Sequence, residues 1–255
     1  MFAEKRRRRI LDILKEEESI SVNELAHSLN VSLPTIRSDL NLLQKENKLE
    51  RTHGGAVLVN PSPKTPHEQS YDTREKLNIH QKREIATKAY SLIQDSECII
   101  LDSSSTCFEL AKLLENSELE ITVLTNGFKT ADLLRENLNL TVILIGGIIR
   151  KKSNAIESLL GEEIFDKINI DKVFFSSYGV SSKNGFSDFN LYEVELKKKM
   201  LQVSNQNIAL IDSSKFNNSS ISSIAKIGDV STIITDKDID PFILNKYKKH
   251  TNFIV

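Results

Sequence analysis

Hydroxyl-bearing side chains directly follow one apolar run of the sequence, at Ser103 to Thr106. The run ECIIL ends just before Asp102, and a helical pattern, TCFELAKLL, begins at Thr106. Free N–H groups and the positive end of the helix dipole make a helix N-terminus a favourable place for an anion. The spacing therefore predicts a phosphate-binding loop. A serine in this position can also be no more than the N-cap of the helix, and that alternative stays open.

Three other apolar runs also end in polar or small residues. The residues concerned are Thr125, Asn126 and Gly127, then Gly146 and Gly147 with Arg150 downstream, and then Asp212 to Lys215. Ligands of parallel α/β sheets bind just beyond the carboxyl ends of the strands. Any one of these ends could be a simple turn, Asp212 to Lys215 included. The recurrence of hydroxyls, glycines and a cation at successive strand ends favours one shared anion site.

The apolar runs predict the sheet that would bring these ends together. Six runs read as strands: ECIIL, ITVLT, TVILIGG, KVFFSS, NIALID and TIIT. From Gln81 onward they alternate with helical patterns, which is typical of a mainly parallel sheet with helices on both faces. Residues 81–255 are therefore expected to form an α/β domain. Residues 60–80, with three prolines between 61 and 66, are expected to form a semi-rigid linker.

Residues 1–59 carry a different pattern, in which short helices follow one another. The basic run Lys5 to Arg9 lies on a first amphipathic helix. Ser21 and Glu24 form a capping box at the start of a second helix. Asn30 tolerates the left-handed conformation in which helices often end. These signals predict two helices and a tight turn before a third helix.

The third helix is predicted to read DNA. Ser32 is its expected N-cap, and Pro34 lies in the first turn, where a missing N–H costs nothing. The buried face is expected to comprise Ile36, Leu40, Leu42 and Leu43. The other face carries Thr35, Arg37, Ser38 and Asn41, near the end that enters the major groove in helix-turn-helix proteins. Arginine suits guanine edges and phosphates equally, so the division between base and backbone contacts stays open.

A β-hairpin is predicted after the third helix. Two short strand-like runs, 49–52 and 56–59, flank His53, Gly54 and Gly55, and glycines suit such a turn. This hairpin would be a wing that brings Arg51 and His53 to the DNA backbone or minor groove, although His53 could equally be a turn residue. The candidate DNA-binding residues are Ser32, Thr35, Arg37, Ser38, Asn41, Arg51 and His53.

Composition sets the class of protein. Hydrophobic residues make up 39% and charged residues 27% of the 255 residues, as in ordinary globular proteins. A net charge of -1 does not favour nucleic acid, and the basic run could be only a solvated helix face, but the distribution of charge matters more than its sum. No stretch is apolar enough to span a membrane, so a cytoplasmic location is expected. Cys98 and Cys107 have no second pair for a metal site, and no cofactor or metal is expected.

The run SVNELAHSLNVSLPTIRSDLNLLQKENKLERTHGGAVL resembles the DNA-binding domain of the DeoR family of transcriptional regulators. The resemblance rests on the Thr-Ile-Arg-x-Asp-Leu helix and the His-Gly-Gly-Ala wing. It implies sequence-specific binding to double-stranded DNA. Ser38 stands where the family commonly has a second arginine, so the operator sequence is expected to differ from those of relatives with two.

Most of residues 81–255 also resembles the DeoR family, whose sensor domain is similar to ribose-phosphate isomerases. The matching pieces are DSSST, TNG, GGIIR, Gly161, YGV, GF, YEVELKKKM and DSSKF. The resemblance implies that Ser103 to Thr106 and Lys215 hold a phosphate. It also implies that Asn126, Glu193 and Lys197 contact a sugar or close the site. Glu193 and Lys197 could instead belong to a solvated helix with i,i+4 pairing.

Two departures from the family pattern concern the same site, because Ser104 replaces a usual glycine and Gly127 a usual serine. The candidate effector-binding residues are Asp102, Ser103, Ser104, Ser105, Thr106, Thr125, Asn126, Gly127, Gly146, Gly147, Arg150, Tyr178, Gly179, Glu193, Lys197, Asp212 and Lys215.

The resemblance as a whole implies a transcriptional regulator, with a repressor of a sugar-metabolism operon as the first expectation. A phosphorylated sugar would bind the α/β domain, and a homodimer or homotetramer would present the DNA-binding domains to repeated half-sites. Activation stays open. The alternative is an isomerase-like enzyme with a DNA-binding appendage. Isomerisation needs a carboxylate base, and the segment Phe175 to Gly179, which looks equivalent to the carboxylate-rich turn of the isomerases, contains no acid.

Overall fold

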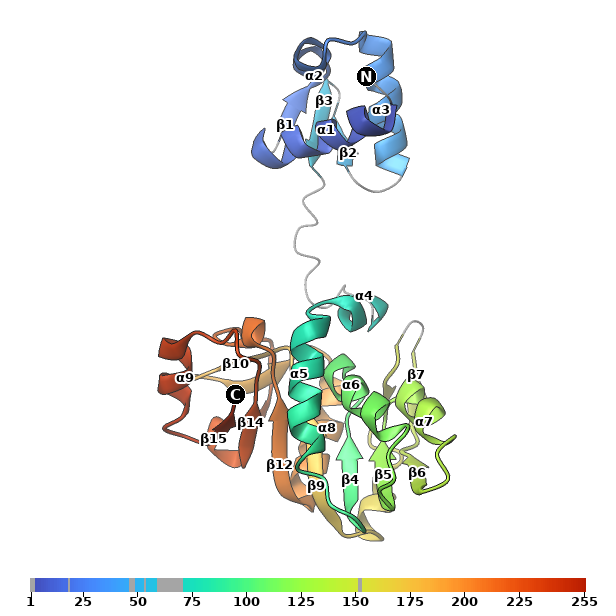
Figure 1. The fold of residues 1–255 in the computed structure, drawn as a ribbon, viewed down its shortest axis with the longest axis vertical. Coiled ribbons are helices and arrows are strands. Elements are labelled where there is room, and N and C mark those ends of the chain that lie inside the picture. Colours follow the sequence, from blue (N-terminus) through green and yellow to red (C-terminus); the bar gives the residue numbers. More distant parts are fainter. Residues whose placement is uncertain (1–2, 18, 46–48, 53, 59–70, 151–152) are drawn as a thin grey trace. The chain divides into compact units, whose positions relative to one another are not determined.

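The computed structural model describes residues 3–17, 19–45, 49–52, 54–58, 71–150 and 153–255. The chain divides into two compact units, Met1–Thr65 and Pro66–Val255 (Figure 1). The predicted linker is too long at its C-terminal end. Residues 71–80 belong to the second unit, where α4 (Tyr71–Lys76) and the first turn of α5 (Ile79–Tyr90) lie. Tyr71 is buried, with its ring edge-on to Phe108 at 6.5 Å.

The N-terminal unit has the predicted helix-turn-helix and wing. It contains α1 (Ala3–Glu17), β1 (Ser19–Ser21), α2 (Val22–Leu29), α3 (Leu33–Lys45), β2 (Leu49–Arg51) and β3 (Gly55–Leu58). The capping box is present, since the Ser21 hydroxyl accepts from the Glu24 amide and the Glu24 carboxylate accepts from the Ser21 amide. Asn30 ends α2 in the left-handed conformation, with φ 51°.

The antiparallel sheet of this unit has the order β1-β3-β2. Strand β1 was not predicted, because it has only three residues and the last of them, Ser21, is also the N-cap of α2. It pairs Ser21 with Gly55, and a Cβ at Gly55 would lie 2.2 Å from the Ile20 carbonyl oxygen, so the close approach requires glycine there. The core contains Ile36, Leu40 and Leu43 as predicted. Leu42, predicted to be buried, is 41% exposed, because it lies on the opposite side of α3.

A seven-stranded sheet forms the centre of the C-terminal unit, in the order β15-β14-β12-β9-β4-β5-β6. All its pairings are parallel. The strands are β4 (Cys98–Leu101), β5 (Ile121–Thr125), β6 (Leu140–Leu144), β9 (Ile170–Phe175), β12 (Ser204–Leu210), β14 (Thr232–Ile234) and β15 (Asn252–Ile254). The six predicted strands are all present. Strand β15 was missed, because NFI is a short run with no helix pattern after it.

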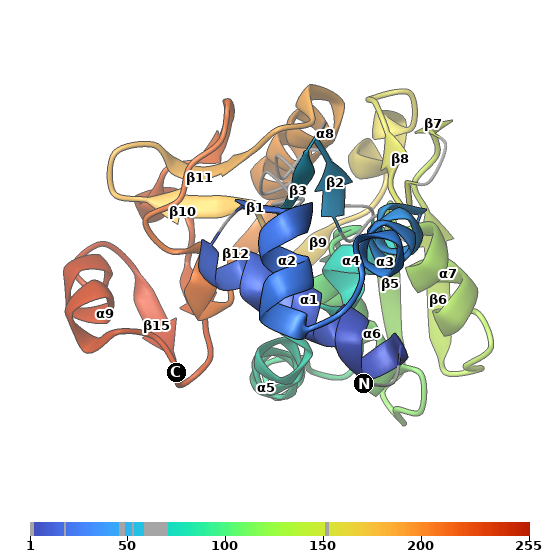
Figure 2. The ribbon, with the colours of Figure 1, turned by 90° about the horizontal axis from the view of Figure 1, so that it is seen from above.

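Helices cover both faces of this sheet, as predicted (Figures 1 and 2). Helices α5, α6 (Ser105–Leu114) and α7 (Phe128–Leu134) pack on one face, and α8 (Leu191–Val203) and α9 (Pro241–Tyr247) on the other. Successive residues of one strand enter different cores: Phe174 packs under α5 and α6, whereas Val173 and Phe175 pack toward α8. Both faces are therefore buried, which explains why the strands read as continuous apolar runs.

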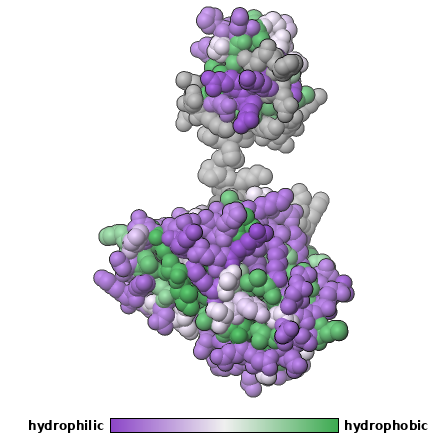
Figure 3. Space-filling model, in the orientation of Figure 1, coloured by the Kyte–Doolittle hydropathy of each residue, from purple (hydrophilic) through white to green (hydrophobic). Residues whose placement is uncertain are grey.

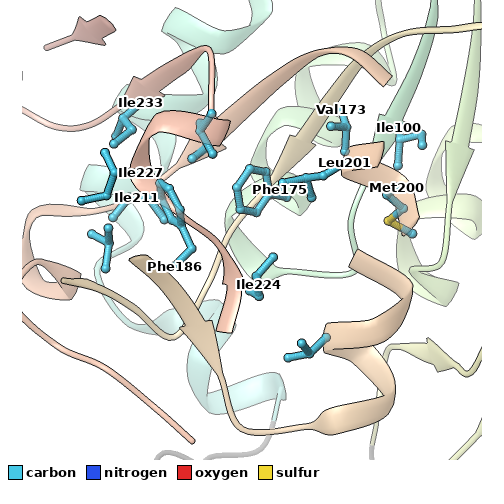
Figure 4. Packing of buried hydrophobic residues seen from close by; sticks show 14 of the residues in the cluster. Ile100, Val173, Phe175, Phe186, Met200, Leu201, Ile211, Ile224, Ile227 and Ile233 are labelled. Atoms are coloured by element: carbon cyan, nitrogen blue, oxygen red, sulfur yellow. The ribbon is translucent and has the colours of Figure 1, made fainter. Parts of the chain in front are cut away.

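Smaller elements that the sequence did not predict extend the α8 face. An antiparallel sheet comprises β10 (Gly179–Ser181), β11 (Gly185–Asp188) and β13 (Ser222–Ala225), and β7 (Ile148–Ile149) pairs with β8 (Ile156–Glu157). Short 3-10 helices cover Glu162–Asp166, Ser213–Lys215 and Ile227–Asp229. Phe186 of β11 packs edge-on to Phe175 at 5.4 Å, which joins the small sheet to the main core (Figure 4). Among the described residues, none of the helices combines the length and apolar character that crossing a bilayer requires.

Candidate functional site

The topology of the large sheet indicates where a ligand would bind. The chain runs from β4 outward to β5 and β6, and then returns to pair β9 with the other edge of β4. Ligands of open α/β sheets bind at the carboxyl ends of the strands where the strand order reverses in this way. Asp102 follows β4 and Ser176 follows β9 at this point, so the residues after these two strands define the switch-point site.

Asp102 and Lys197 form a buried ion pair that joins the two strand ends. The Lys197 ammonium lies 3.2 Å from one carboxylate oxygen of Asp102 and 3.2 Å from Asp188, and donates to the Ser176 carbonyl oxygen at 2.8 Å. The Asp102 carboxylate also accepts from the amides of Ser104 and Ser176, each at 2.9 Å. Asp102 and Lys197 are therefore engaged with protein groups and position the loops. Lys197 is 3% exposed, so the alternative of a solvated helix is wrong for this residue.

The charge states follow from these contacts. Burial alone would raise the pKa of Asp102, but the Lys197 charge and the amide donors outweigh it and hold the pKa below its usual value. Burial would likewise lower the pKa of Lys197, and the charges of Asp102 and Asp188 raise it instead. Both side chains are therefore charged at neutral pH.

The Ser103 to Thr106 loop starts α6 as predicted. Ser104 is the N-cap, since its hydroxyl accepts from the Cys107 amide at 3.2 Å. Ser105 and Thr106 are the first helical residues. The Thr106 hydroxyl is buried and has no hydrogen-bond partner among the described residues. A buried hydroxyl beside free helix amides is suited to an anion or water.

The strand end after β5 packs against this loop. Asn126 accepts from the Ser103 amide at 3.0 Å and donates to the Ser103 hydroxyl at 3.3 Å and to the Ile156 carbonyl at 3.0 Å. Thr125 accepts from the Gly127 amide at 3.0 Å. A Cβ at Gly127 would lie 3.2 Å from the Ser103 Cα, so glycine lets the two strand ends approach closely. The structure thus brings the first and second predicted strand ends together.

The residues after the third predicted strand, β6, contact the β7–β8 region. Gly147 meets a neighbouring strand, since a Cβ there would lie 2.3 Å from the Glu157 carbonyl oxygen, whereas Gly146 has open space. The Arg150 guanidinium donates to the buried Glu157 carboxylate at 2.8 Å and lies over the Tyr192 ring at 5.1 Å. Arg150 is thus paired with Glu157 of β8 rather than with the Ser103 to Thr106 loop.

Lys215, after β12, reaches the switch-point site. Its ammonium donates to the Ser176 hydroxyl at 2.9 Å and lies 3.8 Å from the Asp212 carboxylate. Burial lowers the pKa of Lys215, and the charges of Lys197 and Arg74 act in the same direction. Ser176 therefore links Lys197 and Lys215, so the ends of β4, β9 and β12 meet around it. Sequence reasoning did not select Ser176, because its importance depends on the neighbours of β9.

Tyr178, Gly179 and Glu193 surround this cluster. The Tyr178 ring lies edge-on to Phe189 at 6.2 Å, and a Cβ at Gly179 would lie 2.6 Å from the Asn218 carbonyl oxygen. Glu193 accepts from the Asn190 side chain at 3.0 Å, and burial raises its pKa. A carboxylic acid that retains its proton above the usual pH can donate as well as accept, which suits contact with a sugar hydroxyl.

Lys82 is a functional candidate that the sequence analysis missed. It is 3% exposed, and its ammonium donates to the Leu77 carbonyl at 2.7 Å and to the Arg74 carbonyl. Burial lowers its pKa to about 8, and the charge of Lys215 acts in the same direction. The available signal was a lysine on the buried face of α5, in phase with Ile85 and Ala89.

The DNA-binding candidates gather on α3 and the wing. Arg37, Ser38 and Asn41 are exposed, and the Asn41 side chain accepts from Arg51 at 2.6 Å. The Ser32 and Thr35 hydroxyls are 2.8 Å apart. His53 lies outside the described residues. Figure 3 shows mainly hydrophilic side chains on the described surface of this unit in that view, as expected for the basic α1.

Asp39, also missed, fixes the orientation of α3. It is 5% exposed and binds Arg6 of α1 at 2.5 Å, with Arg7 at 3.8 Å. Two arginines of the basic run are therefore partly used to hold the reading helix rather than being free for DNA. Among the described residues, no group of three or more His, Cys, Asp or Glu side chains is arranged to hold a metal ion.

Comparison with known proteins identifies both units. A model of the DeoR-like helix-turn-helix domain matches residues 6–62, and a model of the DeoR C terminal sensor domain matches residues 77–237. The HTH-type transcriptional regulator GolR of Listeria innocua serovar 6a is 36% identical over 248 residues, covering 97% of this chain and 96% of the relative. The L-fucose operon activator of Haemophilus influenzae is 35% identical over 239 residues, covering 93% of each. Ribose 5-phosphate isomerase A of Methanocaldococcus jannaschii aligns with a TM-score of 0.42 and 18% identity over 55% of each chain.

Proposed function

The chain belongs to the DeoR family of transcriptional regulators, and on that premise we propose that a phosphorylated sugar bound in its C-terminal unit controls how its N-terminal unit binds operator DNA. The observation that carries the proposal is the convergence at Ser176. The segments that follow β4 and β12 supply three groups: the Lys215 ammonium, the N-terminus of α6 and the buried Thr106 hydroxyl. A cation, free amides and a hydroxyl are the groups that bind phosphate.

Support for DNA binding comes from the exposed face of α3. Arg37, Ser38 and Asn41 lie near the end of the helix that enters the major groove in this motif. Arg37 is the residue whose charge and fork suit either a guanine edge or a phosphate. We propose that Arg37 supplies the largest share of specific binding and that Arg51, tied to Asn41, supports it from the wing.

We propose that the site binds its ligand without converting it. An isomerase needs a carboxylate free to remove a proton from carbon. Asp102 and Asp188 are both bonded to Lys197, and the segment Phe175 to Gly179 carries no acid. Glu193, whose burial raises its pKa, is the carboxyl group that an enzyme would use. Incubation with pentose and hexose phosphates decides the matter: saturable binding without product supports the proposal, and turnover that Glu193→Gln abolishes would establish the isomerase alternative.

We propose that the protein acts in the cytoplasm and that its target is a sugar-utilisation operon. A relative in the family is named as the activator of an L-fucose operon, so a sugar operon suits the family. Repression relieved by the sugar phosphate is the form we propose for this chain, with a homodimer or homotetramer matching two or more half-sites.

Two variants test the division of labour between the units. Arg37→Ala is expected to abolish specific operator binding and to leave ligand binding intact. Lys215→Ala is expected to keep operator binding and to lose the response to sugar phosphates. Ligand binding is measured as a thermal shift across a panel of sugar phosphates, because a ligand at 100 times its Kd adds about 2.7 kcal/mol to stability. Folded variants that each lose both activities would contradict the proposal.

A further inference from the structure

Helix α4 contacts α6 and α7 of the C-terminal unit. Lys129 of α7 binds Asp72 at 3.0 Å and Glu75 at 2.9 Å, and its ammonium lies over the Tyr71 ring at 4.7 Å. The same ring packs edge-on to Phe108 of α6. The start of α4 is thereby tied to the helices that follow β4 and β5.

The residues after α4 bind the segment that follows β12, on the other side of the switch-point site. Asn78 donates to the Asp212 carboxylate at 3.1 Å and to the Ser214 hydroxyl at 3.0 Å, both in the segment that follows β12. Lys82 donates to the carbonyls of Arg74 and Leu77 and so holds the end of α4. Residues 71–78 therefore connect the groups after β4 and β5 with the groups after β12, the same strand ends that carry the proposed phosphate ligands.

Arg74 lies in the middle of this connecting segment and has an unused donor. Its Nε is buried without a hydrogen-bond partner among the described residues, and its guanidinium lies 5.8 Å from the centre of the Tyr71 ring. Its charge acts on the pKa values of Lys82, Lys215 and Glu193, so it lies within electrostatic range of all three groups. Arg74 itself is half-buried, and a buried, unpaired donor on a cation that acts on two lysines is unfavourable unless an anion is bound among them.

We propose that Arg74 is a ligand of the phosphate group, which it binds together with Lys215, so that ligand binding ties α4 to the end of β12. This rests on the proposed function, because it concerns the same anion site. The planar guanidinium suits a phosphate better than a third ammonium would, because it can donate two parallel hydrogen bonds. In sequence, α4 is the first described element after the segment that leads from the DNA-binding unit, so the ligand would act on the residues that directly follow that segment.

The test uses the full chain with inorganic phosphate as the probe, measured by isothermal titration calorimetry. Arg74→Ala is expected to weaken phosphate binding by about tenfold or more, the loss typical of a charge-assisted hydrogen bond. Arg74→Lys, which restores the charge without the fork, is expected to recover part of the affinity. The matched control is Lys76→Ala, an exposed cation on the same helix, which should change the affinity by less than about twofold because solvent screens it.

Hydrogen exchange supplies a second readout that a loss of packing alone would not reproduce. Phosphate is expected to slow exchange of the 71–78 amides in the wild type and in Lys76→Ala, and to leave it unchanged in Arg74→Gln, which retains most of the side-chain bulk. Unaltered phosphate affinity in Arg74→Ala and Arg74→Gln, with lost affinity in Lys215→Ala, would overturn the role of Arg74 and keep the proposed site. Unaltered affinity in all three would overturn both.

Discussion

Charges at the switch-point site fall into two groups with different roles. Lys197 is neutralised by two carboxylates, and its contacts with Asp102 and Ser176 serve to hold strand ends together. Lys82 is buried and Lys215 is half-buried, both with less compensation, and the pKa of each is lowered. Lys197 and its carboxylates hold the strand ends together. Lys82 and Lys215 repel each other, and a bound anion would reduce that repulsion.

Binding of sulfate is predicted to weaken as the pH rises through about 8, because Lys82 then loses its proton. Sulfate is the suitable probe because its own charge does not change in this range. The groups that set this titration are Lys215, Asp212, Arg74 and Glu109, besides burial. Calorimetric titrations at pH values on either side of 8 should show the decline in the wild type and in the exposed control Lys249→Gln, and a flatter profile in Lys82→Gln. A profile in Lys82→Gln as steep as that of the wild type would contradict the assignment.

The same shift has a consequence for stability without ligand. The pKa of folded Lys82 lies below its unfolded value, so the unfolded chain binds more protons between about pH 8 and the usual lysine pKa. The burial of a charged amine therefore costs stability below pH 8, and that cost disappears as the pH rises through this window.

At the scale of elements, the contacts between α1 and α3 decide whether the reading helix is correctly placed. Asp39 of α3 is buried and binds Arg6 and Arg7 of α1. Removing one partner of a buried pair leaves an uncompensated charge, whereas exposed pairs contribute little.

Asp39→Ala is predicted to destabilise the N-terminal unit by roughly 3 kcal/mol. Faster hydrogen exchange in α1, α2 and α3, with unchanged exchange in the large sheet, is the expected result. Operator affinity should fall although Asp39 itself is buried. Asp132→Ala, which removes an exposed pair with Arg135, serves as the control and should be nearly neutral. Normal exchange in α1 to α3 of the Asp39 variant would show that the pair does not hold the helices.

The sequence predicted the elements whose signals are local. The capping box at Ser21, the αL residue Asn30 and the six apolar strands are fixed by neighbouring residues, and the structure confirms them. Helix α4 was assigned to a linker because six mostly polar residues have no periodic apolar face, and the contacts of Tyr71 with distant helices decide its structure. The small β10-β11-β13 sheet was missed for the same reason.

Some residues of the candidate site have local sequence signals as well, whereas others depend on residues that are distant in sequence. The Ser103 to Thr106 loop could be found because a strand, a run of hydroxyls and a helix follow one another in the chain. Lys82, Ser176 and Arg74 could not be found, because each acquires its role from residues far away in sequence. Arg150 shows the reverse: it follows a strand end as expected, yet its partner is Glu157 on the adjacent hairpin.

At the scale of the whole molecule, one chain carries a DNA-binding unit and a separate α/β unit, in which we propose the anion site. A ligand can alter DNA binding only if it has different affinities for the states that bind and release the operator. Residues 71–78 adjoin the segment between the units in sequence and share contacts with the proposed phosphate ligands. Regulation would therefore act through the C-terminal side of that segment.

The most direct test of the account is the operator Kd of the full chain, measured by fluorescence anisotropy with and without each of a panel of phosphorylated sugars. At least one sugar phosphate is predicted to change that Kd by about 5- to 150-fold, the range of coupling energies of 1–3 kcal/mol. The change should be absent in Lys215→Ala, whose Kd without ligand stays that of the wild type. An operator Kd of the wild type that is identical with every phosphorylated sugar would contradict the claim that the anion site controls DNA binding.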